Sequence, residues 1–201
     1  MLILASASPR RRELLTQAGY EFQTHPAHIP EDPLPHEDPI AYVTRLARQK
    51  AEAVYNGILG APGLASETWE GATPGHRSLI VLGADTTVTL DNHILGKPEN
   101  PEDAARMLRL LSGRTHRVIT GVALVTATRQ QTAAEVTAVQ FLSLSEEEIQ
   151  AYIASGEPSD KAGAYAIQGR AARWIPRIEG CYFNVVGLPI ALVSTLLEDL
   201  L

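Results

Sequence analysis

Cysteine is nearly missing from this sequence, which has Cys181 alone among 201 residues. One thiol cannot form an internal disulfide or a zinc site of several cysteines, and such scarcity is typical of proteins in a reducing compartment. Basic residues are also outnumbered, because 17 Lys and Arg stand against 23 Asp and Glu for a net charge of -6. We therefore expect neither a nucleic acid polymer nor an anionic membrane as a partner.

Long apolar runs are absent as well. No run approaches the ~18 apolar residues of a membrane-spanning helix. The apolar start, MLILASAS, is short, and positive charge follows it instead of preceding it, which is the reverse of a secretory signal. These features predict a cytoplasmic protein.

Several familiar enzyme motifs are missing too. The sequence contains no Walker-type phosphate loop, no dinucleotide-binding glycine fingerprint and no Gly-x-Ser-x-Gly nucleophile elbow. The six histidines show no metal-ligand spacing, and Cys181 has no identifiable activating partner, which favours a packing role for its thiol. Any nucleotide or phosphate site must therefore be built differently.

Helical and β-strand patterns alternate along the chain, which indicates an α/β fold. Expected helices lie at residues 8–19, 38–57 and 100–113, from Ser145 onward, and after Pro189. Expected strands lie at residues 2–5, 79–84, 115–128, 132–144 and 183–186, with a hairpin over 88–95. Residues 57–78 are rich in Gly, Pro, Ala, Ser and Thr and are predicted to form a surface loop. The two long β-branched segments favour an elongated, mixed sheet over a purely parallel one.

The first predicted helix begins with an unusual cluster of arginines. Ser8 and Pro9 suit the N-cap and first position of a helix, and Arg10 and Arg11 follow on its inward border. Arg12 points toward solvent by its spacing. A helix N-terminus attracts phosphate through its unpaired N–H groups, and Ser6 and Ser8 add hydroxyl donors. A solvated basic turn is the alternative, but positive charge there opposes the helix dipole.

Two charged residues occupy apolar surroundings. Lys50 lies on the apolar stripe of the 38–57 helix, between Leu46 and Val54, where a lysine must either extend outward to water or meet an anion. Asp85 ends an otherwise apolar strand. A carboxylate there can hold a divalent metal or take a proton from water, or it can cap its own turn.

Two further residues stand in predicted loops. Lys97 follows the hairpin, where its pattern alone is that of any loop lysine. Gln168 follows a glycine-rich stretch that would let the backbone approach a ligand, and its amide could read the edge of a base. A plain structural loop is equally compatible with that segment.

These segments together resemble the Maf family of nucleotide pyrophosphatases. The resemblance rests on LILASASPRRRELL at 2–15, VLGADTTV at 81–88, LGKP at 95–98 and SDKAGAYAIQG at 159–169, and it is supported by segments 108–124 and 178–189. It implies one Maf-like domain over residues 1–201, with an elongated mixed β-sheet, flanking helices, and two lobes around a cleft, as in the related inosine triphosphatases.

The resemblance also implies an activity, the hydrolysis of a nucleoside triphosphate between its α and β phosphates with a divalent cation, Mg or Mn. By position, Asp85 matches the family's proton acceptor and a metal ligand, while Glu31 matches an acidic position near the metal, although Pro30 departs from the commoner acidic pair. The phosphate-contacting positions, which include the catalytic lysines, correspond here to Ser6, Arg10, Arg11, Lys50 and Lys97.

Substrate preference in the family varies with three positions, here Arg10, Thr86 and Gln168. The combination of ADT with IQG resembles the branch that acts on dTTP and UTP, and modified pyrimidine nucleotides are also expected substrates. The 7-methyl-GTP branch typically has SDQ instead. The alternatives are an inosine or xanthosine triphosphate pyrophosphatase and a non-catalytic nucleotide-binding regulator of cell division. Homodimers occur in the family, so a homodimer is a further expectation.

Overall fold

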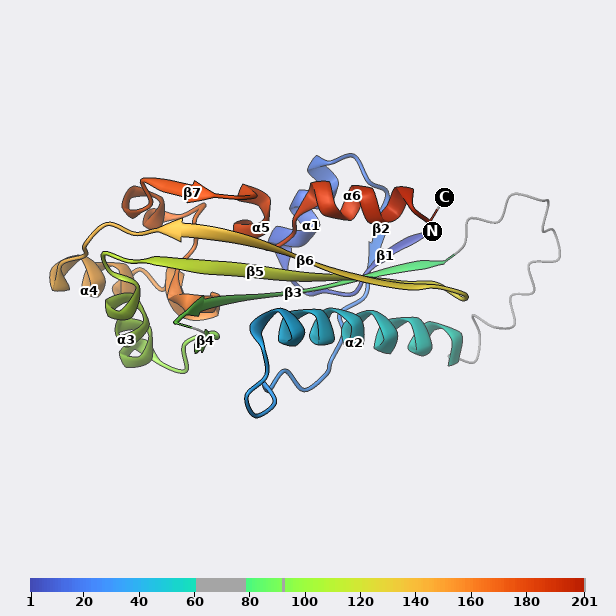
Figure 1. Cartoon of the computed structure of the whole chain (residues 1–201), viewed down its shortest axis with the longest axis horizontal. Coiled ribbons are helices and arrows are strands. Elements are labelled where there is room, and N and C mark those ends of the chain that lie inside the picture. The colour runs from blue at the N-terminus through green and yellow to red at the C-terminus, as the bar shows by residue number, and fades with distance from the viewer. Residues whose placement is uncertain (61–78, 92, 201) are drawn as a thin grey trace.

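Three long antiparallel strands carry the fold of the computed structural model, which describes residues 1–60, 79–91 and 93–200. They are β3 (Ile80–Leu90), β5 (Thr115–Val125) and β6 (Gln130–Gln140). Shorter strands are β1 (Leu2–Leu4), β2 (Phe22–Thr24), β4 (His93–Leu95) and β7 (Arg177–Glu179). The sheet runs β2–β1–β3–β5–β6–β7, β4 pairs with β3, and β1 is parallel to both of its neighbours. The prediction of an elongated mixed sheet is therefore confirmed (Figure 1).

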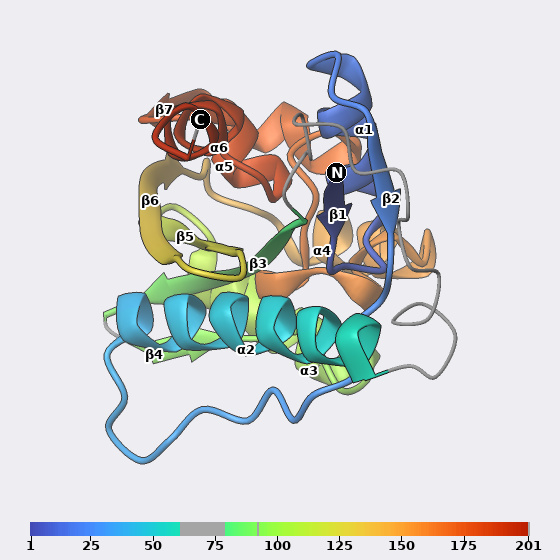
Figure 2. The ribbon, with the colours of Figure 1, turned by 90° about the vertical axis from the view of Figure 1, so that its right-hand side faces the viewer.

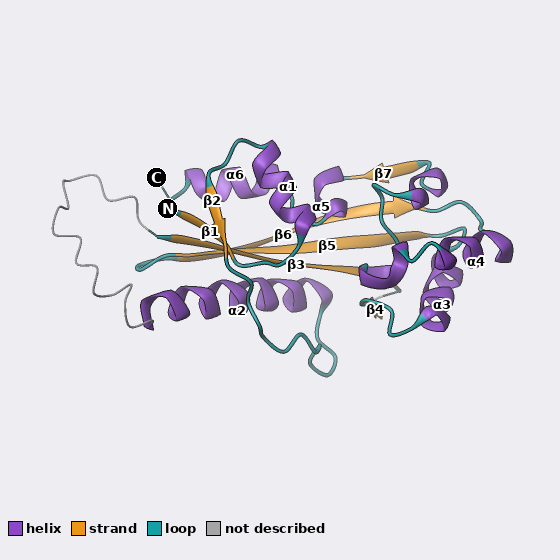
Figure 3. Ribbon diagram, turned by 180° about the vertical axis from the view of Figure 1, so that it is seen from behind, coloured by secondary structure: helices purple, strands orange, loops and turns teal. Residues whose placement is uncertain are grey.

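Helices cover both faces of this sheet. They are α1 (Pro9–Gln17), α2 (Pro39–Gly60), α3 (Pro101–Leu111), α4 (Glu146–Ala154), α5 (Tyr182–Val186) and α6 (Ile190–Glu198). Short 3-10 turns lie at Glu157–Asp160, Ala162–Ala164 and Arg170–Trp174. The long α2 lies on one face, whereas α1, α5 and α6 lie on the other (Figures 2 and 3). Among the described residues, no helix is long and apolar enough to cross a membrane.

Alternation along the strands decides which helix each side chain meets. Ile3 and Val81 are buried in a cluster with Ala47 of α2, whereas Leu4 and Leu82 belong to the core that packs α1, α3, α4 and α6. Successive strand residues point to opposite faces, so the strands buried on both faces read as continuous apolar runs. This explains why the first and third strands were easily predicted from the sequence.

The predicted helix starts agree with the structure. The Ser8 side chain accepts a hydrogen bond from the Arg11 amide, and Pro9 occupies the first turn of α1. Asn100 caps α3, and Ser145 forms a capping box with Glu148 at the start of α4. These caps depend on residues three positions apart, which explains why the sequence alone could indicate them.

The prediction of a strand at 183–186 is wrong, because this segment lies within helix α5. A short apolar, β-branched run does not distinguish a buried strand from a buried helix. The Asn184 side chain docks this helix on the sheet by donating to the Val118 carbonyl and the Thr137 hydroxyl. Strands β2 and β7 were not predicted, since their short sequences, FQT and RIE, form no apolar run. Helix α2 extends to Gly60, and the rest of the loop predicted for 57–78 lies outside the described residues.

Two glycines let α2 pack with its backbone directly on the sheet. A Cβ at Gly83 of β3 would lie 2.0 Å from the Ala47 carbonyl oxygen, and one at Gly121 of β5 would lie 2.4 Å from the Val43 carbonyl. Side chains cannot fit in either place. Gly121 is also the cross-strand partner of Asp85, so the helix comes close to the sheet beside that carboxylate.

A buried histidine makes stability depend on pH. Burial lowers the pKa of His116 to about 4, from an ordinary value of 6.5. Its Nε2 atom lies 2.7 Å from the Tyr165 hydroxyl, and its ring packs edge-on against Phe141. The folded protein keeps this ring neutral to about pH 4, whereas the unfolded chain protonates it from about pH 6.5 downward. The contribution of the neutral ring is therefore complete above pH 6.5 and is lost as the pH falls toward 4.

We expect wild type to lose about 3 kcal/mol more unfolding free energy between pH 7.5 and pH 4 than His116→Gln, which cannot titrate. Urea unfolding of both proteins at a series of pH values measures the difference, and the other titrating groups cancel in the comparison. Parallel pH profiles for the two proteins would contradict this assignment.

Candidate active site

The sequence-predicted site residues come together around one cavity of ≈ 740 Å³. Its lining includes every one of them, namely Ser6, Arg10, Arg11, Glu31, Lys50, Asp85, Thr86, Lys97 and Gln168. They come from the start of α1, the loop before α2, α2 itself, β3, the segment after β4 and the loop after Ala164. The fold therefore joins the separate sequence blocks on a single surface.

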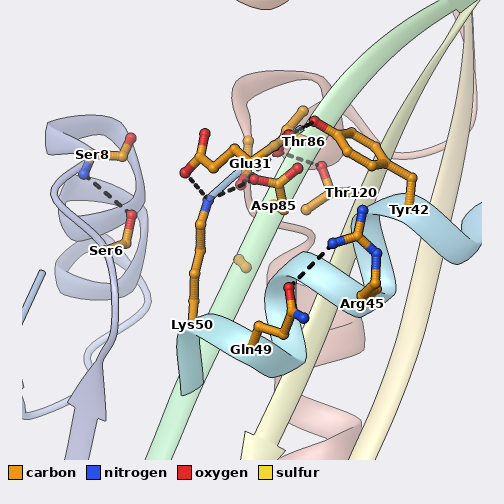
Figure 4. A network of polar contacts seen from close by, with 12 residues as sticks. Ser6, Ser8, Glu31, Tyr42, Arg45, Gln49, Lys50, Asp85, Thr86 and Thr120 are labelled. Atoms are coloured by element: carbon orange, nitrogen blue, oxygen red, sulfur yellow. Dashed lines mark hydrogen bonds and ion pairs between the residues drawn. The ribbon is translucent and has the colours of Figure 1, made fainter. Parts of the chain in front are cut away.

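Lys50 lies at the centre of the charged cluster in the cavity (Figure 4). Its Nζ atom donates to Asp85 Oδ1 at 2.7 Å and lies 2.7 Å from Glu31 Oε1. Its side chain is only 9% exposed, so the alternative in which Lys50 extends outward to water is excluded. The lysine instead meets anions, because α2 packs tightly beside β3.

The carboxylates of Asp85 and Glu31 differ in the direction of their pKa shifts. Desolvation raises the pKa of Asp85, and the positive charges of Lys50 and Arg11 only partly oppose it. Desolvation also acts upward on Glu31, but its hydrogen bond and ion pair with Lys50 outweigh that effect and hold its pKa below the ordinary value. Asp85 is therefore the more basic carboxylate, as a proton acceptor for water requires.

Helix α2 also holds the loop that carries Glu31. The Tyr42 hydroxyl donates to the Glu31 carbonyl oxygen at 2.8 Å, and the Arg45 guanidinium donates to the Asp32 carbonyl oxygen at 3.2 Å. Arg45 also makes a paired interaction with Glu37, with two N···O distances of 2.7 Å. Burial, with the nearby negative charges, raises the pKa of Tyr42 to about 12, so this hydroxyl remains a donor at neutral pH.

Arg11 is buried and crosslinks three parts of the site. Its guanidinium donates to the Gly187 and Ala84 carbonyl oxygens, both at 2.8 Å, to the Ser6 hydroxyl at 3.2 Å and to the Thr86 hydroxyl at 3.0 Å. Its donors are therefore directed at protein acceptors, and the guanidinium fixes Ser6 and Thr86 in place. Desolvation lowers the pKa of Arg11, while Asp85 opposes this shift.

Arg10 lies differently, although the sequence placed it on the same helix border. Its side chain is 31% exposed, and a 3.9 Å ion pair joins it to Asp160. It lines the cavity and keeps enough exposure to reach an incoming anion. Arg12 is exposed, in agreement with its predicted position toward solvent.

Sequence reasoning missed several residues of the site. The Thr120 hydroxyl lies 2.9 Å from that of Thr86, its cross-strand partner. Tyr42 also lines the cavity. Asp160 and Lys161, which the sequence placed in the SDKAGAYAIQG block without a role, line it too, and Lys161 hydrogen-bonds Asp160. Strand register would have indicated Thr120, but register is not visible in a single sequence.

The segment with Lys97 lies against the loop that leads to Gln168. The Gly163 amide donates to the Gly96 carbonyl oxygen at 3.0 Å. Gly163 has a φ of +67°, and a Cβ there would lie 2.9 Å from the Val88 side chain, so only glycine suits this position. The Gln168 side chain is exposed at the cavity wall.

The donor set is compatible with a divalent metal. Asp85 and Glu31 lie close together, because one carboxylate oxygen of each lies 2.7 Å from the same Lys50 nitrogen. Magnesium is commonly held by one or two carboxylates together with substrate phosphates and water. Among the described residues, no group of three or more His, Cys, Asp and Glu side chains gathers to hold a metal by itself. A metal here would therefore depend on substrate oxygens as well.

Comparison with known proteins agrees with this geometry. The sequence model of the Maf-like protein family matches residues 1–200. The dTTP/UTP pyrophosphatases of Koribacter versatilis and Moorella thermoacetica are 49% and 50% identical to this chain, over 98% of its length and 93% of theirs. The dTTP/UTP pyrophosphatase of Thermococcus onnurineus is 46% identical, over 98% of this chain and 97% of its own. With a match along nearly its whole length, the chain belongs to the Maf-like protein family.

Proposed function

We propose that this protein hydrolyses dTTP and UTP, and modified pyrimidine nucleotides of the same shape, to the monophosphate and pyrophosphate. The observation that carries the proposal is the buried Lys50 ammonium group, which lies between the buried Asp85 and the half-exposed Glu31 on the wall of a cavity that Arg10 and Lys97 also line. Relatives at 46–50% identity that are named dTTP/UTP pyrophosphatases support the choice of substrate.

In this mechanism Asp85 takes a proton from a water molecule while the oxygen of that water attacks the α-phosphorus. The bond from that phosphorus to the α–β bridging oxygen breaks, and pyrophosphate leaves with the bonding electrons. Lys50 holds the Asp85 carboxylate at 2.7 Å. Arg10, Lys50 and Lys97 stabilise the negative charge of the triphosphate and of the leaving group. A divalent Mg or Mn ion held by Asp85 and Glu31 would, when bound, supply further positive charge beside the phosphates.

Base selection is assigned to Thr86, Gln168 and Arg10, which line the same cavity. Thr86 is held between Arg11 and Thr120, so its hydroxyl has a fixed position. Gln168 offers both a donor and an acceptor, as reading the edge of a pyrimidine requires. With Arg10, these residues would distinguish dTTP and UTP from other nucleotides.

The test is pyrophosphate release from dTTP, UTP, CTP, 7-methyl-GTP and ITP, with Mg or Mn present and then chelated. We expect metal-dependent release, chiefly from dTTP and UTP. Preferred release from 7-methyl-GTP or ITP would support the proposed reaction but contradict the roles given to Arg10, Thr86 and Gln168 in base selection. Tight nucleotide binding without release would instead favour the regulator of cell division.

We also propose that residues 1–201 form a single domain that acts in the cytoplasm as a homodimer. The continuous sheet from β2 to β7 supports one domain. The single Cys181 supports a reducing compartment.

A further inference from the structure

Two hydrogen-bonded side chains, Tyr152 and Glu157, hold the loop that carries Gln168 and are here called the polar relay. Tyr152 of α4 is only 2% exposed, and its hydroxyl donates to Glu157 Oε1 at 2.7 Å. The same hydroxyl accepts a hydrogen bond from the Ala166 amide at 3.1 Å. The Glu157 carboxylate in turn accepts from the Arg170 amide with both oxygens, at 3.1 and 3.2 Å. The relay therefore binds the backbone two residues before and two residues after Gln168.

The intervening backbone is shaped to fit this carboxylate. A Cβ at Gly169 would lie 1.9 Å from Glu157 Oε1, so the carboxylate occupies the space where any other residue would place its side chain. This gives a physical reason for the glycine that follows Gln168. The Tyr152 ring is held edge-on against Trp174, with ring centroids 5.1 Å apart, and cannot move aside easily.

Neither relay side chain lines the cavity. Among the described residues, Gln168 and the two residues before it line the cavity, whereas Tyr152 and Glu157 do not. Their effect on substrate must pass through the loop that they hold. Recognition of a base edge by an amide requires close control of position, because hydrogen bonds weaken steeply with distance and angle.

We propose that Tyr152 and Glu157 are positioning residues that set nucleotide selectivity by fixing the backbone on both sides of Gln168. This inference rests on the proposed function, since it takes Gln168 as the residue that reads the base. Loss of the relay leaves the Asp85 and Lys50 cluster in place, so the effect appears in discrimination between bases, largely through KM for the preferred nucleotide.

The experiment measures kcat and KM for dTTP and CTP and compares the ratio of kcat/KM values. We expect Tyr152→Phe to lower the preference for dTTP about tenfold, as the loss of a buried hydrogen bond to a recognition loop implies. Glu157→Ala should lower it similarly, and Glu157→Gln less, because an amide oxygen still accepts from Arg170. The matched control is Tyr20→Phe, which removes a hydroxyl bonded to Ser194 at 2.7 Å, away from the cavity, and should leave the ratio unchanged.

A double mutant tests whether the relay acts through Gln168. Adding Tyr152→Phe to Gln168→Ala should cause no further loss of selectivity, since the residue being positioned is already gone. An unchanged dTTP/CTP ratio in folded Tyr152→Phe and Glu157→Ala would overturn the proposal. Equal losses for both nucleotides, or full additivity in the double mutant, would do so as well. A wild-type enzyme without preference for dTTP would instead refute the proposed function, before any variant is compared.

Discussion

Replacing Asp85 with asparagine is expected to lower kcat about a thousandfold, within the range of general-base catalysis. The amide has nearly the shape of the carboxylate and still offers an oxygen to Lys50, which donates to Asp85 at 2.7 Å in the wild-type protein. It cannot take a proton from water at neutral pH. The variant should therefore bind nucleotide in a folded site but fail to activate the nucleophile.

The fold should survive this change. Burial raises the pKa of Asp85, which means that its charge is costly in the folded protein, and Glu31 remains as an anionic partner for Lys50. Steady-state kinetics with dTTP and a thermal melt measure the two effects separately. The matched control is Asp91→Asn, which removes the same charge from an exposed pair with Arg114 and should leave kcat near wild type. A kcat of Asp85→Asn within tenfold of wild type would contradict the assignment of Asp85 as the proton acceptor.

The second large effect is expected at Gly83. Its Cβ in an alanine variant would lie 2.0 Å from the Ala47 carbonyl oxygen and 2.9 Å from the Ala51 amide nitrogen, both in the backbone of α2. Backbone atoms cannot rotate away as a side chain does, so the whole helix must move. We expect Gly83→Ala to lose about 3 kcal/mol or more of unfolding free energy, at the upper end of overpacking effects.

Activity should fall with stability in this variant, because α2 also carries Lys50, and moving the helix draws the lysine away from Asp85. The control is Gly57→Ala in the same helix, where a Cβ would meet nothing within 4 Å. That change should stabilise the protein by up to about 1 kcal/mol, since alanine favours a helix over glycine. Urea unfolding measures both variants. A loss below 1 kcal/mol in Gly83→Ala would contradict the close packing of α2 on the sheet.

Arg10 and Arg11 differ in burial and contacts, and the sequence could not predict this difference. Helical spacing placed both on the inward border and could not distinguish them. Arg11 is buried because Gly187, distant in the sequence, offers it a carbonyl oxygen at 2.8 Å, whereas Arg10 remains partly exposed beside Asp160. The segment at 183–186 shows the same limit. Its apolar pattern was compatible with a strand, but its packing on the sheet makes it a helix.

The sequence by itself determined the local features of this protein. Caps such as Ser8 and Ser145 act over three residues, buried strands read as continuous apolar runs, and the motif blocks identified the candidate residues through the family they resemble. Only the tertiary structure decided that Lys50 pairs with Asp85 and Glu31 and does not reach water. The physical reason is that these contacts depend on strand register and on how closely α2 approaches the sheet at Gly83 and Gly121, and no local pattern encodes that distance.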